Sequence, residues 1–208
     1  MKLRYFAYLL LISSFYITGC KESNNSSNDN QTNSKSNEEK STVISQMLEL
    51  KDSIESYQKK AFALEEEKIS STTALIDEVK NVVTGYDAAT LMNIQKQLDV
   101  LKAKKYTKET LDDESVMLAY DDACDSLVNL VQLLATETED FSKYNRANLL
   151  INDILDANSQ DFFVRKDYNS YVLDYNNLLE ANKSTIEASG SQELPLEKYP
   201  LFYGELES

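Results

Sequence analysis

The sequence is short of several residue types: its 208 residues include no histidine and no tryptophan, and only 4 glycines, 2 prolines and 2 cysteines. Without histidine, a Ser-His-Asp or Cys-His catalytic centre and the common histidine-containing zinc sites are excluded. The scarcity of glycine and proline leaves few positions for turns, which favours long helices. Because no segment shows the sustained two-residue alternation of a β-strand, we predict an all-α protein.

The N-terminal residues have the layout of a bacterial lipoprotein signal. A basic start with Lys2 and Arg4 precedes an apolar run over residues 5–16, which leads into an Ile-Thr-Gly-Cys sequence that ends at Cys20. The run has the length of a signal-peptide core and is shorter than the ~20 residues of a membrane-spanning helix. We therefore expect residues 1–19 to be removed and Cys20 to carry diacylglycerol and an N-acyl chain such as palmitate, which together give stable membrane attachment. An ordinary secretory signal or an uncleaved anchor helix is the alternative.

Residues 20–42 are predicted to be a lipidated and disordered tether. After Cys20 this segment contains no aliphatic or aromatic residue and is dominated by asparagine and serine, so it cannot bury a core. We expect a lipid-anchored, extracytoplasmic protein at the cell membrane or the outer membrane. Lys21 occupies the position where an aspartate often retains lipoproteins at the inner membrane.

The charge of the chain restricts its partners. With 35 acidic and 21 basic residues, the formal net charge is −14. Such a surface argues against nucleic acid and against lying flat on anionic lipid. It is compatible with a cationic partner, although acidic runs are more often solvated surface.

Apolar residues recur every three or four positions along residues 43–208, which predicts four helices. The predicted helices run over Val43–Thr84, with a stutter or bend at residues 69–73 and Gly85 as the stop; from Asp87 to about Lys104; from a cap at Asp112 or Asp113 through Leu134; and from about Ser142 to just before Gly190. We therefore predict a four-helix bundle with a long first helix. The aromatic residues of the segment 191–208 favour its docking on this bundle.

Two segments show a more specific pattern. The first is LIDEVKNVVTGY at residues 75–86, and the second is RKDYNSYVLDYN at residues 165–176, followed later by Tyr199-Pro200. They resemble the LIPNLV..VKGY and R..YN..V..YN..I..FP stretches of the LemA family of bacterial envelope proteins. The resemblance spans about Val43 to Phe202. It implies a four-helix bundle facing outward from a membrane, in a family with no established molecular activity and no set of catalytic residues.

The chain also departs from the pattern of that family. Asp77 stands where the family has a proline, and Asn158 stands where it has an acidic residue before Arg165. The lipoprotein signal that ends at Cys20 replaces the plain membrane anchor that is common in the family.

Repeated Tyr-Asn pairs are the sharpest local feature of the predicted fourth helix. Tyr168-Asn169 and Tyr175-Asn176 lie seven residues apart, which is two helical turns on one face, and Arg165 lies one turn before them. These side chains could line a polar groove for a small ligand, a peptide or a cell-wall glycan. In the alternative that we favour, the tyrosines belong to the core and the asparagines bond the C-terminal segment or loops.

Other polar residues give weaker signals. Asp121 and Asp125 share a helix face and could contribute to a calcium site, but the spacing of an EF-hand is absent. The acidic runs 112–114 and 65–67 are typical of solvated surface. Cys124 lies on the apolar stripe of the third helix and is predicted to be a small buried residue. We expect no metal, cofactor or catalytic centre.

The sequence therefore favours a lipid-anchored, non-enzymatic helical envelope protein that acts through protein–protein contacts. The alternative is a lipoprotein that binds a small ligand, a peptide or a cell-wall glycan on the face formed by Arg165, Tyr168, Asn169, Tyr175 and Asn176.

Overall fold

The computed structural model describes residues 29–190 and 194–204 of the chain, and none of these residues forms a strand. Its elements are α1 (Asp29–Val82), α2 (Ala88–Lys104), the 3₁₀-helix η1 (Lys108–Thr110), α3 (Glu114–Glu137), the 3₁₀-helix η2 (Phe141–Lys143) and α4 (Asn145–Ser189). The prediction of an all-α bundle of four helices with a long first helix is confirmed for the part of the chain described.

Capping residues determine where α2, α3 and α4 begin or end. At the start of α2, the Asp87 carboxylate accepts a hydrogen bond from the backbone N–H of Thr90 at 2.8 Å. Asp113 accepts one from the N–H of Ser115 at 2.9 Å and so begins α3. Gly190, with φ of 66°, ends α4 in the left-handed conformation that glycine adopts without strain. The predicted boundaries agree closely with these helices.

The predicted start of the first helix at Val43 is wrong. α1 begins at Asp29 and ends at Val82, so it includes the second half of the segment predicted as a disordered tether. Once the packed part of a helix has formed, each further residue adds to it at little cost, and the lysines and glutamates before Val43 are good helix formers. Residues 1–28, which include Cys20 and the predicted signal, lie outside the described part.

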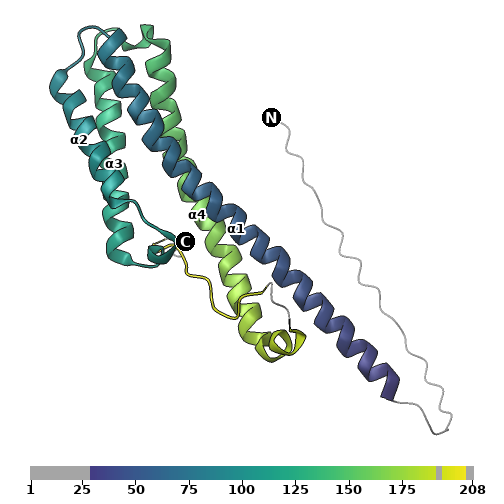
Figure 1. Cartoon of the computed structure of the whole chain (residues 1–208). Helices are drawn as coiled ribbons and strands as arrows, with labels where there is room; N and C mark the ends of the chain where they lie inside the picture. The colour runs from purple at the N-terminus through teal and green to yellow at the C-terminus, as the bar shows by residue number, and fades with distance from the viewer. Residues whose placement is uncertain (1–28, 191–193, 205–208) are drawn as a thin grey trace, which may run out of the picture.

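α1 and α4 form a long antiparallel pair that the other elements cover on one side. In Figure 1, the α2–α3 hairpin packs beside one end of this pair, and the C-terminal segment 194–204 runs along the other half of α4. We call the four-helix end, residues 65–165, the head, and the remaining half of the pair, residues 40–64 and 166–189, the arm. The C-terminal segment thus covers part of the arm that the hairpin leaves open.

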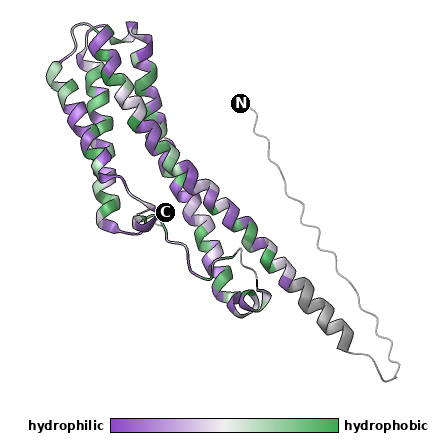
Figure 2. Cartoon of the chain, in the orientation of Figure 1, coloured by the Kyte–Doolittle hydropathy of each residue, from purple (hydrophilic) through white to green (hydrophobic). Residues whose placement is uncertain are grey.

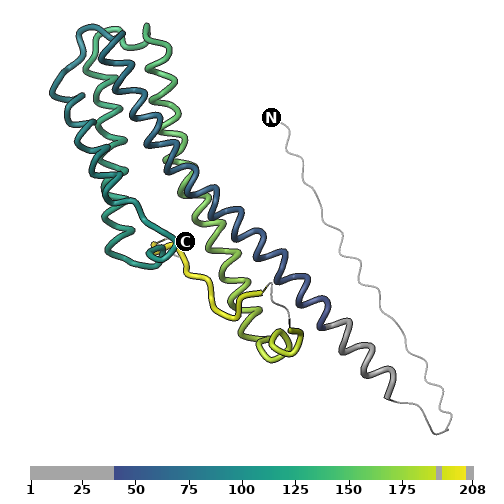
Figure 3. The backbone as a smooth tube through the Cα atoms, viewed as in Figure 1, coloured from purple at the N-terminus to yellow at the C-terminus, as the bar shows by residue number. Residues whose placement is uncertain are grey.

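α1 shows no stutter. The backbone trace in Figure 3 runs without interruption from the arm into the head, and α1 is a single 54-residue helix. Its buried positions continue in steps of three and four through the stretch predicted to bend, at Ala61, Glu65, Lys68, Thr72 and Ile76. The apolar pattern is interrupted there because polar side chains occupy core positions.

The coloured parts of the four α-helices combine hydrophobic and hydrophilic residues (Figure 2). Accordingly, none of the helices in the described residues has the length and apolar character that crossing a membrane requires.

Candidate functional site

The C-terminal segment 194–204 is bound to α4 through its backbone. The side-chain amide of Asn169 donates from Nδ2 to the carbonyl of Phe202, and its Oδ1 accepts from the N–H of Phe202, both at 2.8 Å. Asn176 forms the same pair of hydrogen bonds with Tyr199, both at 3.0 Å. Each asparagine therefore satisfies both backbone polar groups of one residue, as a neighbouring β-strand would.

Two tyrosines of the same face bind the segment as well. The Tyr168 hydroxyl donates to the carbonyl of Pro200 at 3.1 Å, and the Tyr175 hydroxyl donates to the carbonyl of Pro195 at 2.9 Å. Both tyrosines are fully buried. Burial raises the pKa of Tyr175 to about 12 and the pKa of Tyr168 also above its usual value. Both hydroxyls therefore stay protonated and act as donors.

The spacing of the two asparagines matches the spacing of the residues that they bind. Seven residues of an α-helix rise about 10.5 Å, which separates Asn169 from Asn176. Tyr199 and Phe202 lie three residues apart, and three extended residues span about 10 Å. Because the earlier asparagine binds the later residue of the segment, the segment is held in one register and runs antiparallel to α4.

Phe202 anchors the segment in the core. Its ring is fully buried and makes edge-to-face contacts with Tyr168 and Tyr106, at centroid distances of 4.9 Å and 5.5 Å. The next residue, Tyr203, donates its N–H to the carbonyl of Leu111 at 2.9 Å, which ties the segment to the connection between α2 and α3. The segment therefore joins the arm to the head.

The structure separates the five residues predicted for the polar face into two groups. Tyr168, Asn169, Tyr175 and Asn176 together bind the C-terminal segment, as the alternative of core tyrosines and segment-bonding asparagines requires. Arg165 points instead into an ionic cluster in the interior. Binding of a separate ligand on this face stays a prediction.

Arg165 joins α3, α4 and the C-terminal segment. Its guanidinium pairs with Asp161 at 2.6 Å and with Asp121 at 2.9 Å. Three aromatic rings surround it, with its central carbon 5.1 Å from the ring of Tyr106 and 5.6 Å from those of Tyr120 and Phe202. A planar, delocalised cation suits such a mixture of carboxylates and ring faces better than an ammonium group does.

Lys68 of α1 occupies the same cluster. Its Nζ lies 2.8 Å from Glu65 Oε1 and 3.3 Å from Asp161 Oδ2, and it donates to the sulfur of Cys124 at 3.5 Å. Burial lowers the pKa of Lys68, but the carboxylates raise it more, so that the side chain stays charged. Cys124 is buried, as predicted, and burial raises the pKa of its thiol to about 12. The thiol is therefore protonated at neutral pH and is a poor nucleophile.

The prediction that residues 65–67 are all solvated is wrong for Glu65, which is fully buried, whereas Glu66 and Glu67 are exposed. Burial and the neighbouring Asp161 carboxylate raise the pKa of Glu65 to about 8, against the opposing effect of Lys68. With Glu65 protonated, two cations face two carboxylates in the cluster, and the charges balance. Glu65 lies four residues after Ala61, at a position where the spacing of buried residues along α1 places a core side chain. This spacing could have identified Glu65 as buried.

A small surface pocket of about 250 Å³ opens onto this cluster. It is lined by Asp121, Cys124, Asp125, Asn158, Asp161, Phe162 and Arg165. Asp121, one of the two residues considered for calcium, is engaged by Arg165. Among the residues that the structure describes, no three His, Cys, Asp or Glu side chains are grouped so as to hold a metal ion.

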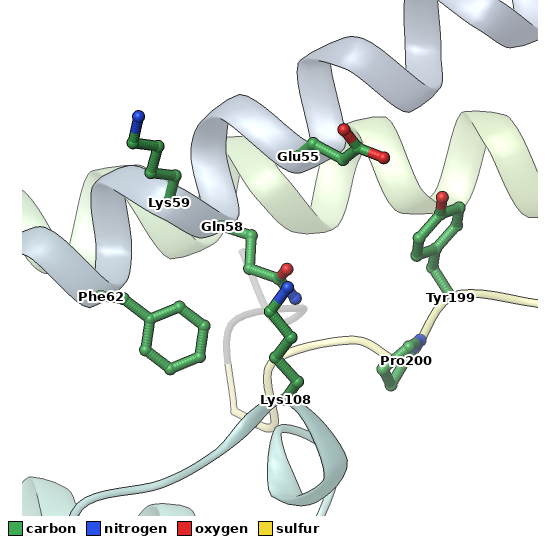
Figure 4. A pocket seen from close by; sticks show the side chains of 7 residues that line it. All are labelled: Glu55, Gln58, Lys59, Phe62, Lys108, Tyr199 and Pro200. Carbon is green, nitrogen blue, oxygen red and sulfur yellow. The ribbon is translucent and has the colours of Figure 1, made fainter.

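A larger groove of about 760 Å³ lies between α1, η1 and the C-terminal segment (Figure 4). Its lining consists of Glu55, Gln58, Lys59 and Phe62 from α1, Lys108 from η1, and Tyr199 and Pro200. Tyr199 and Pro200 form one wall opposite α1, so the groove separates this side of the segment from α1.

Comparison with protein families, with curated proteins and with solved structures finds no match to this chain. The resemblance to the LemA family therefore rests on the sequence pattern alone.

Proposed function

We propose that this chain is a lipid-anchored, non-enzymatic, LemA-like helical protein of the cell envelope that acts through protein–protein contacts. The observation that carries the proposal is the position of the head relative to the start of α1. α1 begins at Asp29, closely after the predicted lipid site at Cys20, and the head lies at its opposite end (Figure 1). A helix of 54 residues is about 80 Å long, so an anchored chain presents its head far from the lipid.

The use of its polar residues supports a non-enzymatic role. Lys68, Asp161 and Arg165 have the chemistry of catalytic groups, but they are buried and pair with one another. Cys124 is protonated and nearly inaccessible. These groups hold three helices together rather than facing an open cleft.

Exposed apolar residues on the head supply a candidate contact surface. Phe162 and Phe163 of α4 are 53% and 60% exposed, and their rings contact each other at 5.4 Å. Leu118 of α3 is 50% exposed. Aromatic side chains are enriched at protein interfaces.

Cross-linking of the full chain in its native membrane, followed by affinity capture, tests this function. We expect a defined partner with the wild-type chain, its loss when Phe162 and Phe163 are both changed to serine, and its retention in the control Leu173→Ser, an exposed residue of the arm. The Cys20→Ala chain should lose the partner because it lacks the anchor. Recovery of background proteins alone with the wild-type chain would refute the proposal.

Peptide binding on α4 is the second candidate function. The asparagines and tyrosines of α4 already bind an extended segment through its backbone, which favours a peptide over a glycan as the ligand of this face. A thermal-shift screen with peptides and peptidoglycan fragments separates the two classes, because a ligand of the native state raises its melting temperature.

A further inference from the structure

We propose that the pocket of about 250 Å³ between α3 and α4 binds a primary ammonium group, supplied by a lysine side chain of a partner protein. This pocket, whose lining is given above, is here called the acidic pocket. The inference deepens the proposed function by giving the chemistry of one contact. It rests on that function only for the protein that carries the lysine.

The acidic pocket is formed by one face of each helix. Asp121 and Asp125 of α3 lie four residues apart. On α4, Asn158 lies three residues before Asp161 and four before Phe162. Residues three or four positions apart project from the same side of a helix. Three aspartates and one arginine line the pocket, so negative charge is in excess there.

Asp125 gives the acidic pocket a negative charge that the chain does not offset. The guanidinium of Arg165 pairs with Asp161 at 2.6 Å and with Asp121 at 2.9 Å. Lys68 also pairs with Asp161, at 3.3 Å. These two cations offset the two carboxylates, whereas Asp125 is exposed and has no ion-pair partner among the residues that the structure describes. One monovalent cation would therefore balance the charge of the pocket.

Asp161 supplies an acceptor that the described part of the chain leaves unused. Its Oδ2 pairs with both Lys68 and Arg165. Its Oδ1 is buried and receives no hydrogen bond from the described residues, and the whole side chain is only 6% exposed. A buried carboxylate oxygen without a donor is unfavourable. Because Asp161 lines the acidic pocket, a donor that enters there can satisfy this oxygen.

Donor count and size favour an ammonium group over other cations. An ammonium group carries three N–H donors and no acceptor. The pocket offers acceptor oxygens on three side chains, those of Asp125, Asn158 and Asp161. A calcium ion would need about six to eight oxygen ligands. The volume of about 250 Å³ lies below the roughly 300–1,000 Å³ of pockets for drug-sized molecules, so it suits a single side chain.

Two aromatic side chains at the pocket favour a lysine that belongs to a protein. Phe162 lines the pocket and is 53% exposed, so its ring can contact the alkyl stem and the ammonium group of a lysine. Phe163 is 60% exposed, and its ring contacts that of Phe162 at 5.4 Å, which extends the apolar surface beyond the pocket. An apolar residue beside the lysine can use this surface, whereas a free diamine cannot.

NMR titration of the full-length chain in detergent micelles tests the site. The probe is acetyl-lysine amide, and the control is acetyl-norleucine amide, which has the same stem without the ammonium group. We expect the lysine probe to shift the backbone amide signals of Asp125, Asn158 and Phe162, and the norleucine control to shift none of them. Calcium chloride is the third ligand. Calcium binding at these residues that displaces the lysine probe would overturn the assignment to an ammonium group.

Matched variants separate the pocket from the acidic surface in general. Asp125→Asn should raise the dissociation constant of the lysine probe by about tenfold, because a hydrogen bond to a charged group is lost. Asp122→Asn removes the same charge from an exposed neighbour outside the pocket and should change it by less than about twofold. Asn158→Asp adds a carboxylate and should lower it. Equal effects of the two Asp→Asn changes would overturn the site.

These variants are expected to keep the fold. Asp125 and Asn158 take no part in the ion pairs that hold Asp161 and Arg165, so their substitution leaves the cluster intact. Thermal unfolding checks each variant. A lysine probe that shifts none of the pocket signals in the correctly folded wild type would overturn the inference.

Two peptides separate a lysine within a protein from a free diamine. Acetyl-Leu-Lys-Leu amide should bind about fivefold tighter than acetyl-Ser-Lys-Ser amide, because its leucines cover the exposed phenylalanines. Phe163→Ser should remove this difference and leave the binding of acetyl-lysine amide unchanged. Cadaverine is the free diamine. Tighter binding of cadaverine than of either peptide would overturn a protein lysine as the source of the ammonium group.

Partner capture from the native membrane distinguishes this inference from the proposed function. We expect the partner to be lost with Asp125→Asn and retained with Asp122→Asn. Retention with both variants would refute the role of the acidic pocket and leave the proposed function standing. Binding of the lysine probe without any captured partner would refute the proposed function and leave the ammonium site standing.

Discussion

The side-chain amide of Asn169 and the backbone of Phe202, 33 residues further along the chain, pair through two hydrogen bonds of 2.8 Å. Both groups are nearly inaccessible to water. A side-chain amide offers a donor and an acceptor side by side, so asparagine at this position determines both where the segment lies and in which register.

Replacing Asn169 with aspartate tests that pairing. The carboxylate keeps the acceptor for the N–H of Phe202 but places a second acceptor against its carbonyl. We expect the free energy of unfolding to fall by about 1–3 kcal/mol, the range for an unsatisfied buried polar group. Denaturant titration measures it, with the exposed Asn177→Asp as the matched control. Equal losses in the two variants would show that the pairing contributes nothing.

Two substitutions of Tyr168 separate the contribution of its packing to stability from that of its hydrogen bond. Tyr168→Phe removes the hydroxyl that donates to Pro200 but keeps the ring, and should cost about 1 kcal/mol. Tyr168→Ala also leaves a cavity beside Phe202 and should cost about 3–5 kcal/mol. Thermal unfolding of the two variants gives the comparison. An unchanged melting temperature in Tyr168→Ala would contradict the burial of this residue.

Arg165→Met should destabilise the bundle by about 3–5 kcal/mol, because it leaves the carboxylate of Asp161 buried with a single cation nearby. Arg165→Lys should restore little, since an ammonium group cannot bridge Asp121 and Asp161 in the same geometry. Arg146→Met is the control: that arginine is exposed and pairs with Glu78 at 3.5 Å, a contact worth less than about 1 kcal/mol. Equal stability of the two methionine variants, measured by denaturant titration, would argue against a stabilising cluster.

Glu65 should make the stability of the protein depend on pH. Its pKa is about 8 in the folded chain and 4.5 without the influence of the fold, so the folded state keeps a proton that the unfolded state releases. This contribution to stability is complete below pH 4.5 and is lost as the pH rises through 8. The charged groups that face Glu65 are Lys68 of the same helix, and Asp161 and Arg165 of α4.

Glu65→Gln removes this proton equilibrium. Between pH 5 and 8, we expect its free energy of unfolding to rise relative to that of the wild type by about 2–4 kcal/mol. Unfolding titrations at four or five pH values provide the measurement, with Glu67→Gln as a control for the loss of an exposed carboxylate. A constant difference across this range would show that Glu65 is ionised in the folded chain.

Local chemistry in the sequence was sufficient to predict most of the fold. Asp87, Asp113 and Gly190 act on backbone groups within a few residues of themselves, so the ends of α2, α3 and α4 can be predicted without knowledge of the fold. The start of α1 depends instead on propagation from a packed region, which no capping residue marks.

The ionic cluster could not be predicted in the same way. Lys68 is 93 residues from Asp161 and 56 from Cys124, so two of the partners that make its burial tolerable come from other helices, whereas Glu65 lies on its own. When such partners are not known, a charged residue in the sequence predicts a position at the surface. For the α4 face, a seven-residue spacing placed Tyr168, Asn169, Tyr175 and Asn176 together, but it did not identify what they bind. That requires the three-residue spacing of Tyr199 and Phe202, the residues bound by the two asparagines, which no hydrophobic pattern signals.

The pairing of the first helix with the last has a consequence for the order of folding. α2 and α3 are neighbours in the chain and can pair as soon as both have been synthesised. α1 packs mainly against α4, and Met47 and Ile54 in its arm have no hairpin to cover them. During synthesis, the apolar residues of α1 that later pack against α4 therefore stay exposed while the α2–α3 hairpin forms beside α1. The arm can assemble only when the last quarter of the protein has emerged, which makes this stripe a binding target for chaperones until then.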